Sequence, residues 1–187
     1  MSQQPIPQAT SSLEMWLDYL SNIHTSAIDL GLDRVQAVAS KANLTKPAQH
    51  VITVAGTNGK GSTAACLASV LSKAGYRVGL YTSPHLTSFT ERIKIGNHEI
   101  SRKDVDRLTQ LLINKERKID SITFFEFVTA MALLYFAEKK VDLCILEVGM
   151  GGRLDATNVV SPFISIITNI SKEHEYYLGN TLLEIAR

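Results

Sequence analysis

The chain has 187 residues, a length that suits one domain with a sizeable hydrophobic core. Hydrophobic residues make up 45% of it, and 19 Lys and Arg side chains nearly balance 18 Asp and Glu side chains, for a net charge of +1. This balance argues against a basic surface for nucleic acid or anionic membranes, so any anion must be held by a local site.

Neither a signal peptide nor a membrane span is expected from the sequence. Residues 1–10 are polar and contain prolines, so no signal peptide is expected. The longest apolar tract, residues 124–137, is interrupted by Glu126 and Thr129 and is too short to cross a bilayer. Cys66 and Cys144 lie in a predicted helix and a predicted strand without CxxC spacing, so both are expected to be reduced core residues. Together these features predict a cytoplasmic protein.

Two helices are predicted before residue 50. Ser11 and Glu14 have the spacing of a capping box, and Trp16 falls on the apolar face of the helix that they open. Residues 28–32 are then predicted to form a loop, followed by a helical run that ends before Pro47. Such a loop can close over a ligand or simply connect two helices, and the sequence leaves both readings open.

The strongest local signal lies at residues 51–62, where an apolar strand runs into a glycine-rich turn and then a helix over 60–74. This is the pattern of a phosphate-binding loop, in which backbone N–H groups and the helix N-terminus hold an anion. Lys60 would reach the outer phosphates, and the Ser62 hydroxyl suits the accompanying magnesium. The spacing of Gly56, Gly59 and Gly61 differs from the commonest phosphate-loop pattern, and an ordinary glycine-rich turn is the alternative.

A second strand over 77–81 completes a strand–helix–strand unit and ends just before Ser83. Loops at the carboxyl ends of such strands contact ligands, so Ser83 is expected near the phosphate site, although a turn-capping role before Pro84 is equally open. Residues 92–95 and 98–100 flank a two-residue turn and predict a hairpin, expected as a surface excursion. Ser101 and Asp104 then cap another helix.

The segment from Thr123 to Lys139 predicts a helix that is apolar on nearly every side and therefore buried against the sheet. Two adjacent aromatic residues, Phe124 and Phe125, cannot both face the core on one turn. One of them could stack on a flat heteroaromatic ligand, or the two could bridge separate packing layers.

A third apolar strand over 141–146 ends in Glu147, the position where a carboxylate commonly anchors nucleotide-bound magnesium. The glycine-rich loop over 148–158 is expected to face a substrate. A fourth apolar strand over 163–168 leads to His174, which could complete a magnesium shell or be a solvated loop residue. Thr181 and Glu184 cap a last helix. These elements predict an α/β fold with a mostly parallel sheet and flanking helices.

Five motifs together resemble the bacterial dihydrofolate synthase/folylpolyglutamate synthase family of the Mur ligase superfamily. They are residues 56–62, 81–86, 91–93, 123–127 and 147–158. The resemblance extends from the first predicted helix to the last residue, and it implies a truncated Mur ligase central domain of the P-loop NTPase type. One departure is Glu173 before His174, where the family usually has Asp.

The resemblance implies an ATP- and Mg²⁺-dependent amide ligase that adds L-glutamate to dihydropteroate, or to tetrahydrofolate and other folates, through an acyl phosphate. Lys60, Glu147 and His174 would be catalytic. ATP would be bound by Gly56, Thr57, Asn58, Gly59, Lys60, Gly61 and Ser62, and magnesium by Ser62, Ser83, Glu147 and His174. The pterin pocket would comprise Ile28, Asp29, Leu30, Pro84, Thr123, Phe124, Phe125, Glu126, Leu154, Asp155 and Ala156.

Members of this family are more than twice as long as this chain. The resemblance therefore implies that residues 1–187 are the N-terminal part of the ATP-binding domain and that the C-terminal glutamate-ligase domain is absent. The expected partners are small molecules, without nucleic acid or membrane, and the full-length protein is expected to be a monomer. Two alternatives remain open: a non-catalytic nucleotide- or pteroate-binding fragment, and a ligase of peptidoglycan precursors from the same superfamily.

Overall fold

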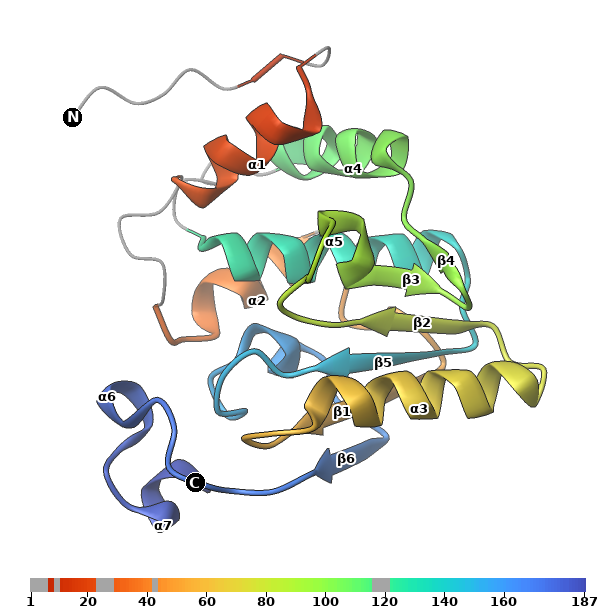
Figure 1. The fold of residues 1–187 in the computed structure, drawn as a ribbon. Helices are drawn as coiled ribbons and strands as arrows, with labels where there is room; N and C mark the ends of the chain where they lie inside the picture. Colours follow the sequence, from red (N-terminus) through yellow and green to blue (C-terminus); the bar gives the residue numbers. More distant parts are fainter. Residues whose placement is uncertain (1–6, 9–10, 23–28, 42–43, 116–121) are drawn as a thin grey trace.

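The computed structural model describes residues 7–8, 11–22, 29–41, 44–115 and 122–187, which are arranged around a six-stranded sheet (Figure 1). The strands are β1 (His50–Ala55), β2 (Val78–Tyr81), β3 (Ile93–Ile95), β4 (His98–Glu99), β5 (Leu143–Glu147) and β6 (Ile164–Ile167). Their order is β4-β3-β2-β5-β1-β6, with β2, β5, β1 and β6 paired in parallel. The predicted mostly parallel α/β sheet is confirmed.

The hairpin at residues 93–99 is part of the sheet, so its prediction as a surface excursion was wrong. β3 pairs antiparallel with β2, and β4 pairs antiparallel with β3. Ile93 and Ile100 are buried and joined by a backbone hydrogen bond of 2.8 Å, so the hairpin has an apolar side that packs on the protein.

Helices cover both faces of the sheet. They are α1 (Leu13–Ser21), α2 (Asp33–Lys41), α3 (Lys60–Lys73), α4 (Arg102–Lys115), α5 (Phe124–Glu138), α6 (Glu175–Leu178) and α7 (Leu182–Ile185), with the 3₁₀ turns η1 (Phe89–Arg92) and η3 (Ala156–Val159). Helix α3 packs on β1, β2 and β5, whereas α5 packs on β2 and also contacts α1, α2 and α4. The cap of α1 differs from the prediction by one residue, because the Ser12 hydroxyl accepts the Met15 N–H and the Ser11 hydroxyl instead accepts the Gln8 N–H.

Two hydrophobic cores follow from the alternation of side chains along the strands. In β5, Leu143 and Ile145 pack in the core beneath α3, while Cys144 and Leu146 join the larger core that includes α5. Trp16 of α1 is 2% exposed and belongs to the larger core, as predicted. The nearly all-apolar sequence of α5 is explained by its position between the sheet and the helices outside it.

The parallel strands bring four loops to one edge of the sheet. Gly56 follows β1, Ser83 follows β2, Glu147 ends β5 and Asn169 follows β6. Because parallel strands share one direction, their carboxyl ends are neighbours, and open α/β sheets bind ligands at this edge.

Strand β6 lies at the open edge of the sheet and is largely exposed, with Ile167 at 63% exposure and the preceding Phe163 at 70%. In the part of the chain that the structure describes, no helix is both long and apolar enough to span a membrane.

The two cysteines differ in environment, so the prediction that both are core residues was wrong for Cys66. Helix α3 buries Ala64 and Ala68 against the sheet, and Cys66, two residues from each, faces outward and is exposed. Cys144 is buried in β5, and its burial raises the pKa of the thiol to about 12.

We expect a thiol-alkylating reagent at about pH 8 to modify Cys66 in the native protein and to spare Cys144, because the reactive species is the exposed thiolate. Mass spectrometry after labelling, with and without denaturant, measures this directly. Equal labelling rates for the two thiols in the native state would contradict the burial of β5.

Candidate functional site

The glycine-rich loop between β1 and α3 has the backbone shape of an anion cradle. Gly56 and Gly59 adopt positive φ angles of 128° and 80°, and Gly59 is the N-cap of α3. The N–H groups of the first helical turn have no partner within the helix and point out of its positive end. A side chain at Gly56 would overlap the Thr168 hydroxyl, so only glycine fits between this loop and β6.

Residues after β6 hold this loop from the other side. The Thr57 N–H donates to the Asn169 carbonyl (2.9 Å), and the Asn58 N–H donates to Asn169 Oδ1 (3.0 Å). The Thr168 hydroxyl donates to the Asn58 carbonyl (2.7 Å), and the Ser171 N–H donates to the Thr57 hydroxyl (2.9 Å). The position of the loop is therefore fixed by a segment more than 100 residues away in the sequence.

The Lys60 side chain folds back over the loop. Its Nζ donates to the Gly56 carbonyl (2.7 Å) and the Thr57 carbonyl (3.0 Å), so the ammonium group lies at the mouth of the cradle. Its contact with bound phosphates stays a prediction.

Glu147, at the carboxyl end of β5, is a buried carboxylate beside the loop and is 5% exposed. Its Oε2 accepts the Ser83 N–H at 3.0 Å, and its carboxylate lies next to Gly61, where a Cβ would be 3.4 Å from Oε1. Burial raises the pKa of Glu147, and the Ser83 N–H and the Lys60 charge oppose that shift. The structure thus brings together Glu147, Ser83 and the start of α3, which the sequence separates widely.

The other two predicted metal ligands are less enclosed. Ser62 is exposed on the first turn of α3. His174 is exposed at the N-cap of α6 with φ 51°, a strained conformation for a residue other than glycine, and its Nε2 lies 3.8 Å from Glu173 Oε1. Among the described residues, no three His, Cys, Asp or Glu side chains form a cluster, and the predicted set contains only two residues of those types.

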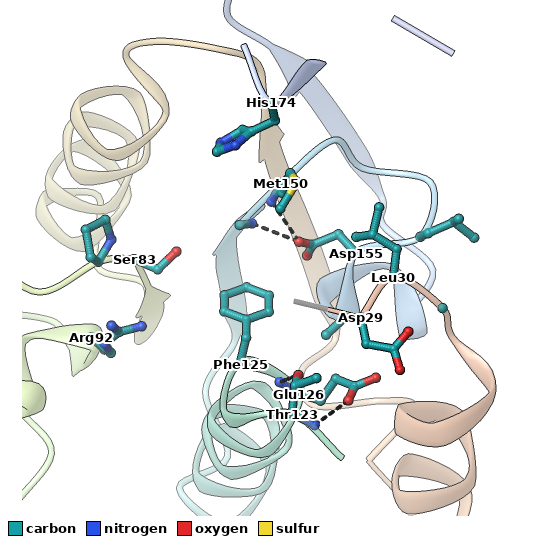
Figure 2. A pocket seen from close by; sticks show the side chains of 15 residues that line it. Asp29, Leu30, Ser83, Arg92, Thr123, Phe125, Glu126, Met150, Asp155 and His174 are labelled. Carbon is teal, nitrogen blue, oxygen red and sulfur yellow. Dashed lines mark hydrogen bonds between the residues drawn. The ribbon is translucent and has the colours of Figure 1, made fainter. Parts of the chain in front are cut away.

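A pocket of about 290 Å³ opens beside this site (Figure 2). Nine residues predicted for the pterin pocket line it: Asp29, Leu30, Pro84, Thr123, Phe125, Glu126, Leu154, Asp155 and Ala156. Ser83 and His174, predicted as metal ligands, line it as well. Ile28 lies outside the described residues.

Four further lining residues were not predicted: Gly31, Arg92, Gly149 and Met150. Gly31 lies in the predicted loop, directly after the predicted site residues Asp29 and Leu30, and Gly149 and Met150 lie in the glycine-rich loop that was expected to face a substrate. Arg92 lies within the matched 91–93 motif, and its neighbours in the sequence gave no reason to assign it a role. A search for charged residues beside the ends of the strands would have included it.

The two adjacent phenylalanines take separate roles. Thr123 and Glu126 form a capping box that starts α5, and this sets the direction of the first turn. Phe125 lines the pocket with its ring centroid 6.0 Å from that of Tyr81. Phe124 does not line it, contrary to its prediction as a substrate contact: its ring packs on Phe89, with centroids 6.3 Å apart. Phe125 therefore faces the pocket, and Phe124, one residue earlier, packs on Phe89.

Asp155 fastens the glycine-rich loop. Its Oδ2 accepts the N–H groups of Gly149 and Met150 (both 3.0 Å), and its Oδ1 accepts the N–H (2.9 Å) and hydroxyl (2.6 Å) of Thr157. Burial raises the pKa of Asp155, and these four donors oppose the shift. Gly149 also gives the Phe125 ring room, since a Cβ there would lie 2.7 Å from Cζ.

Arg34, which the sequence did not single out, ties the loop at Asp29 to the start of α5. Its guanidinium donates to the Asp29 carbonyl (2.6 Å) and lies 3.0 Å from the Asp29 carboxylate. It also forms an ion pair with Glu126, with Nη2 3.1 Å from Oε1. The prediction that residues 28–32 are a loop is confirmed for 29–32, and this loop forms one wall of the pocket (Figure 2).

The pocket and the phosphate loop are contiguous. A small hollow of about 30 Å³ is lined by Gly56, Thr57 and Lys60, and it shares Gly149, Met150 and His174 with the larger pocket. A ligand held in the pocket and an anion held on the loop would therefore be neighbours.

Comparison with known proteins gives concordant matches. Residues 54–186 match the family model described as the Mur ligase middle domain. The chain is 46% identical over 181 residues to the dihydrofolate synthase/folylpolyglutamate synthase of Escherichia coli strain K12, covering 97% of this chain and 43% of that protein. The chain thus spans less than half the length of this relative.

Solved structures of folylpolyglutamate synthase/dihydrofolate synthase enzymes also match this chain. E. coli FolC in complex with DHPP and ADP superposes with a TM-score of 0.93 at 45% identity, over 96% of this chain and 43% of that one. A bifunctional folylpolyglutamate synthase/dihydrofolate synthase with Mn, AMPPNP and L-glutamate bound superposes with a TM-score of 0.89 at 46% identity, over 97% and 44% of the two chains.

We expect Arg34→Met to destabilise the fold by about 2–4 kcal/mol, because it leaves the buried Glu126 carboxylate without its cation. Urea denaturation measures the loss, and adding Glu126→Gln should recover part of it. The matched control is Arg102→Met, which removes an exposed ion pair with Glu14 and should cost less than about 1 kcal/mol. Equal losses of stability in the two variants would contradict a stabilising ion pair between Arg34 and Glu126.

We expect Glu147→Gln to raise the melting temperature of the ligand-free protein at neutral pH. The folded-state pKa of Glu147 lies above its ordinary value of 4.5, so the stability that this group contributes is complete below pH 4.5 and is lost as the pH rises through the folded pKa. The variant lacks that loss, and its advantage should shrink as the pH approaches 4.5. Thermal melts of both proteins over a pH series measure this difference. A difference in melting temperature that grows on acidification would contradict the raised pKa of Glu147.

Proposed function

This chain belongs to the Mur ligase family, and on that basis we propose that it acts in an ATP-dependent amide ligase that joins L-glutamate to dihydropteroate and to folates. The proposed reaction has two steps. The acceptor carboxylate attacks the terminal phosphorus of ATP, releasing ADP and leaving an acyl phosphate. The glutamate amino group then attacks the acyl carbon, so that a C–N bond forms and phosphate departs with loss of a proton from the amine.

One observation carries this proposal: the hydrogen bond of 3.0 Å from the Ser83 N–H to the Glu147 carboxylate. Ser83 lines the pocket, and Glu147 lies beside Gly61 at the start of α3. Glu147 thus contacts both a residue of the pocket wall and the start of α3, an arrangement that suits the transfer of a phosphoryl group onto the pocket's ligand.

The phosphate loop supports ATP as the co-substrate. Lys60 already lies over the loop and needs only a change of side-chain rotamer to exchange two carbonyl acceptors for phosphate oxygens. In this proposal it neutralises charge that builds up on the phosphoryl group during transfer. The relative crystallised with AMPPNP and the one crystallised with ADP support the same reading.

Mg²⁺ fits the residues present. Glu147 is a buried carboxylate whose pKa burial raises, so a neighbouring cation would offset the cost of its charge. The Ser62 and Ser83 hydroxyls add hard oxygen ligands, and the His174 imidazole would complete the set. When bound, the ion would neutralise negative charge on the phosphates. The Mn in a structure of a relative supports a divalent site.

The pocket supports a flat, polar acceptor. Phe125 forms an aromatic part of the pocket wall, and the buried Asp155 fixes the glycine-rich loop next to it (Figure 2). This aromatic wall favours a pterin over the peptide-bearing acceptor of a peptidoglycan-precursor ligase.

The proposed enzyme is a monomer in the cytoplasm and acts in folate biosynthesis and one-carbon metabolism. In the cytoplasm the free thiols of Cys66 and Cys144 would stay reduced.

We expect MgATP to bind saturably in a calorimetric titration of this chain and Lys60→Ala to weaken it at least about tenfold, since the variant removes the cation facing the phosphates. Omitting magnesium should weaken binding similarly. A Lys73→Ala control, at the far end of α3, should bind as the unchanged chain does. Undiminished binding by Lys60→Ala would remove the phosphate loop from the proposal.

Turnover separates the three candidate functions. We expect ADP release that requires both dihydropteroate and L-glutamate, measured by a coupled assay. ADP release with a peptidoglycan precursor instead would favour the other ligase class. Ligand binding without glutamate-dependent ADP release would favour a binding role for this chain.

A further inference from the structure

Arg92 is a buried arginine on the wall of the pocket. It is 8% exposed and ends η1 immediately before β3. Its carbonyl accepts the Thr82 N–H at 2.9 Å, which places it beside Ser83. Figure 2 shows the guanidinium of Arg92 and the hydroxyl of Ser83 on the same wall, both directed toward the interior of the pocket.

Among the described residues, this guanidinium contacts an imidazole and an aromatic ring. Nε donates to His85 Nδ1 at 2.8 Å, and Cζ lies 5.5 Å from the centre of the Phe124 ring. No described residue accepts from the four N–H bonds of its two terminal nitrogens. These nitrogens are not among the fully enclosed, unsatisfied side-chain atoms of the described interior, so they remain open to the pocket.

The neighbouring carboxylates have other partners. Glu91 turns away and accepts the N–H groups of residues 86–88 at 2.7–3.0 Å. Glu99 accepts the Thr90 hydroxyl at 2.6 Å and lies 3.5 Å from Lys94. None of the acidic residues described by the structure forms an ion pair with Arg92.

Two carboxylates at the site, Asp155 and Glu147, accept hydrogen bonds from groups other than Arg92. Asp155 accepts four hydrogen bonds from its own loop, and Glu147 accepts from Ser83. Burial lowers the pKa of Arg92, yet a guanidinium remains charged at any physiological pH. A buried charge without a counter-ion is costly, and no described residue pairs with this one or accepts from its terminal nitrogens.

We propose that Arg92 is the anion subsite of this pocket and binds the carboxylate of the pteroyl acceptor, an inference that rests on the proposed ligase function. Its terminal nitrogens match a carboxylate in a two-point hydrogen bond. Ser83 lies beside it and contacts Glu147, so a carboxylate at Arg92 faces the phosphate loop. The flat ring of the ligand then extends past Phe125 toward the walls formed by Asp29, Leu30 and Asp155 (Figure 2).

Equilibrium binding of pteroate and of its neutral carboxamide analogue to the chain tests this subsite. The unchanged chain should prefer pteroate. Arg92→Gln should weaken pteroate binding by roughly ten- to a hundredfold and carboxamide binding by less than about threefold, because only the charged ligand uses the guanidinium. Arg92→Lys should fall between them, since it keeps the charge without the two-point geometry.

Two controls keep the test specific. Arg102→Gln removes an exposed arginine that pairs with Glu14 and should leave both affinities unchanged. The melting temperature of ligand-free Arg92→Gln should equal or exceed that of the unchanged chain, because the variant removes an uncompensated buried charge. A large drop in this temperature together with equal loss of both ligands would mean a structural role and would overturn the subsite.

The outcomes also separate this inference from the proposed function. If the unchanged chain binds pteroate and Arg92→Gln binds it equally well, the subsite is wrong and the ligase proposal stands. If the unchanged chain binds MgATP but neither pteroate nor its carboxamide, the pteroyl acceptor is wrong, and the subsite falls with it.

Discussion

The parallel pairing of β2, β5, β1 and β6 is the constraint on which the site depends. Because these strands run in one direction, the loop after each of them opens at the same edge of the sheet. The phosphate loop, Ser83, Glu147 and the segment at Asn169 come from four separate parts of the sequence and meet there. The Ser83–Glu147 hydrogen bond and the contacts of Asn169 with the phosphate loop then hold the loops in register.

Buried charge is concentrated at this edge, and it is compensated unevenly. Asp155 has four donors from its own loop, and Glu126 has the Arg34 guanidinium. These two carboxylates stabilise the walls of the pocket. Glu147 and Arg92 are different, because each keeps a buried charge that the protein only partly satisfies. Buried charges that lower the stability of the ligand-free protein are expected where a bound ligand supplies the opposite charge.

The hairpin and the start of α5 show why some side chains were assigned incorrectly. The pattern of residues 92–100 predicts two short strands and a turn, but it does not say whether a neighbouring strand has a free edge. β2 does have one, so the hairpin extends the sheet and carries Arg92 to the pocket. Similarly, Phe124 and Phe125 have the same chemistry, and only the direction of the first helical turn, set by the Thr123–Glu126 capping box, decides which ring faces the pocket.

The sequence by itself determined the elements whose signals are local. The glycine spacing around Lys60, the apolar run that ends in Glu147 and the capping residues of α4 and α7 each depend on a few adjacent side chains, and the structure agrees with them. The five motifs also identified most of the pocket lining. Tertiary structure alone decided the partners across long separations: Arg34 with Glu126, Asn169 with the phosphate loop, and the absence of an ion-pair partner for Arg92 among the described residues. Such contacts depend on strand order and helix placement, which no single segment of the chain encodes.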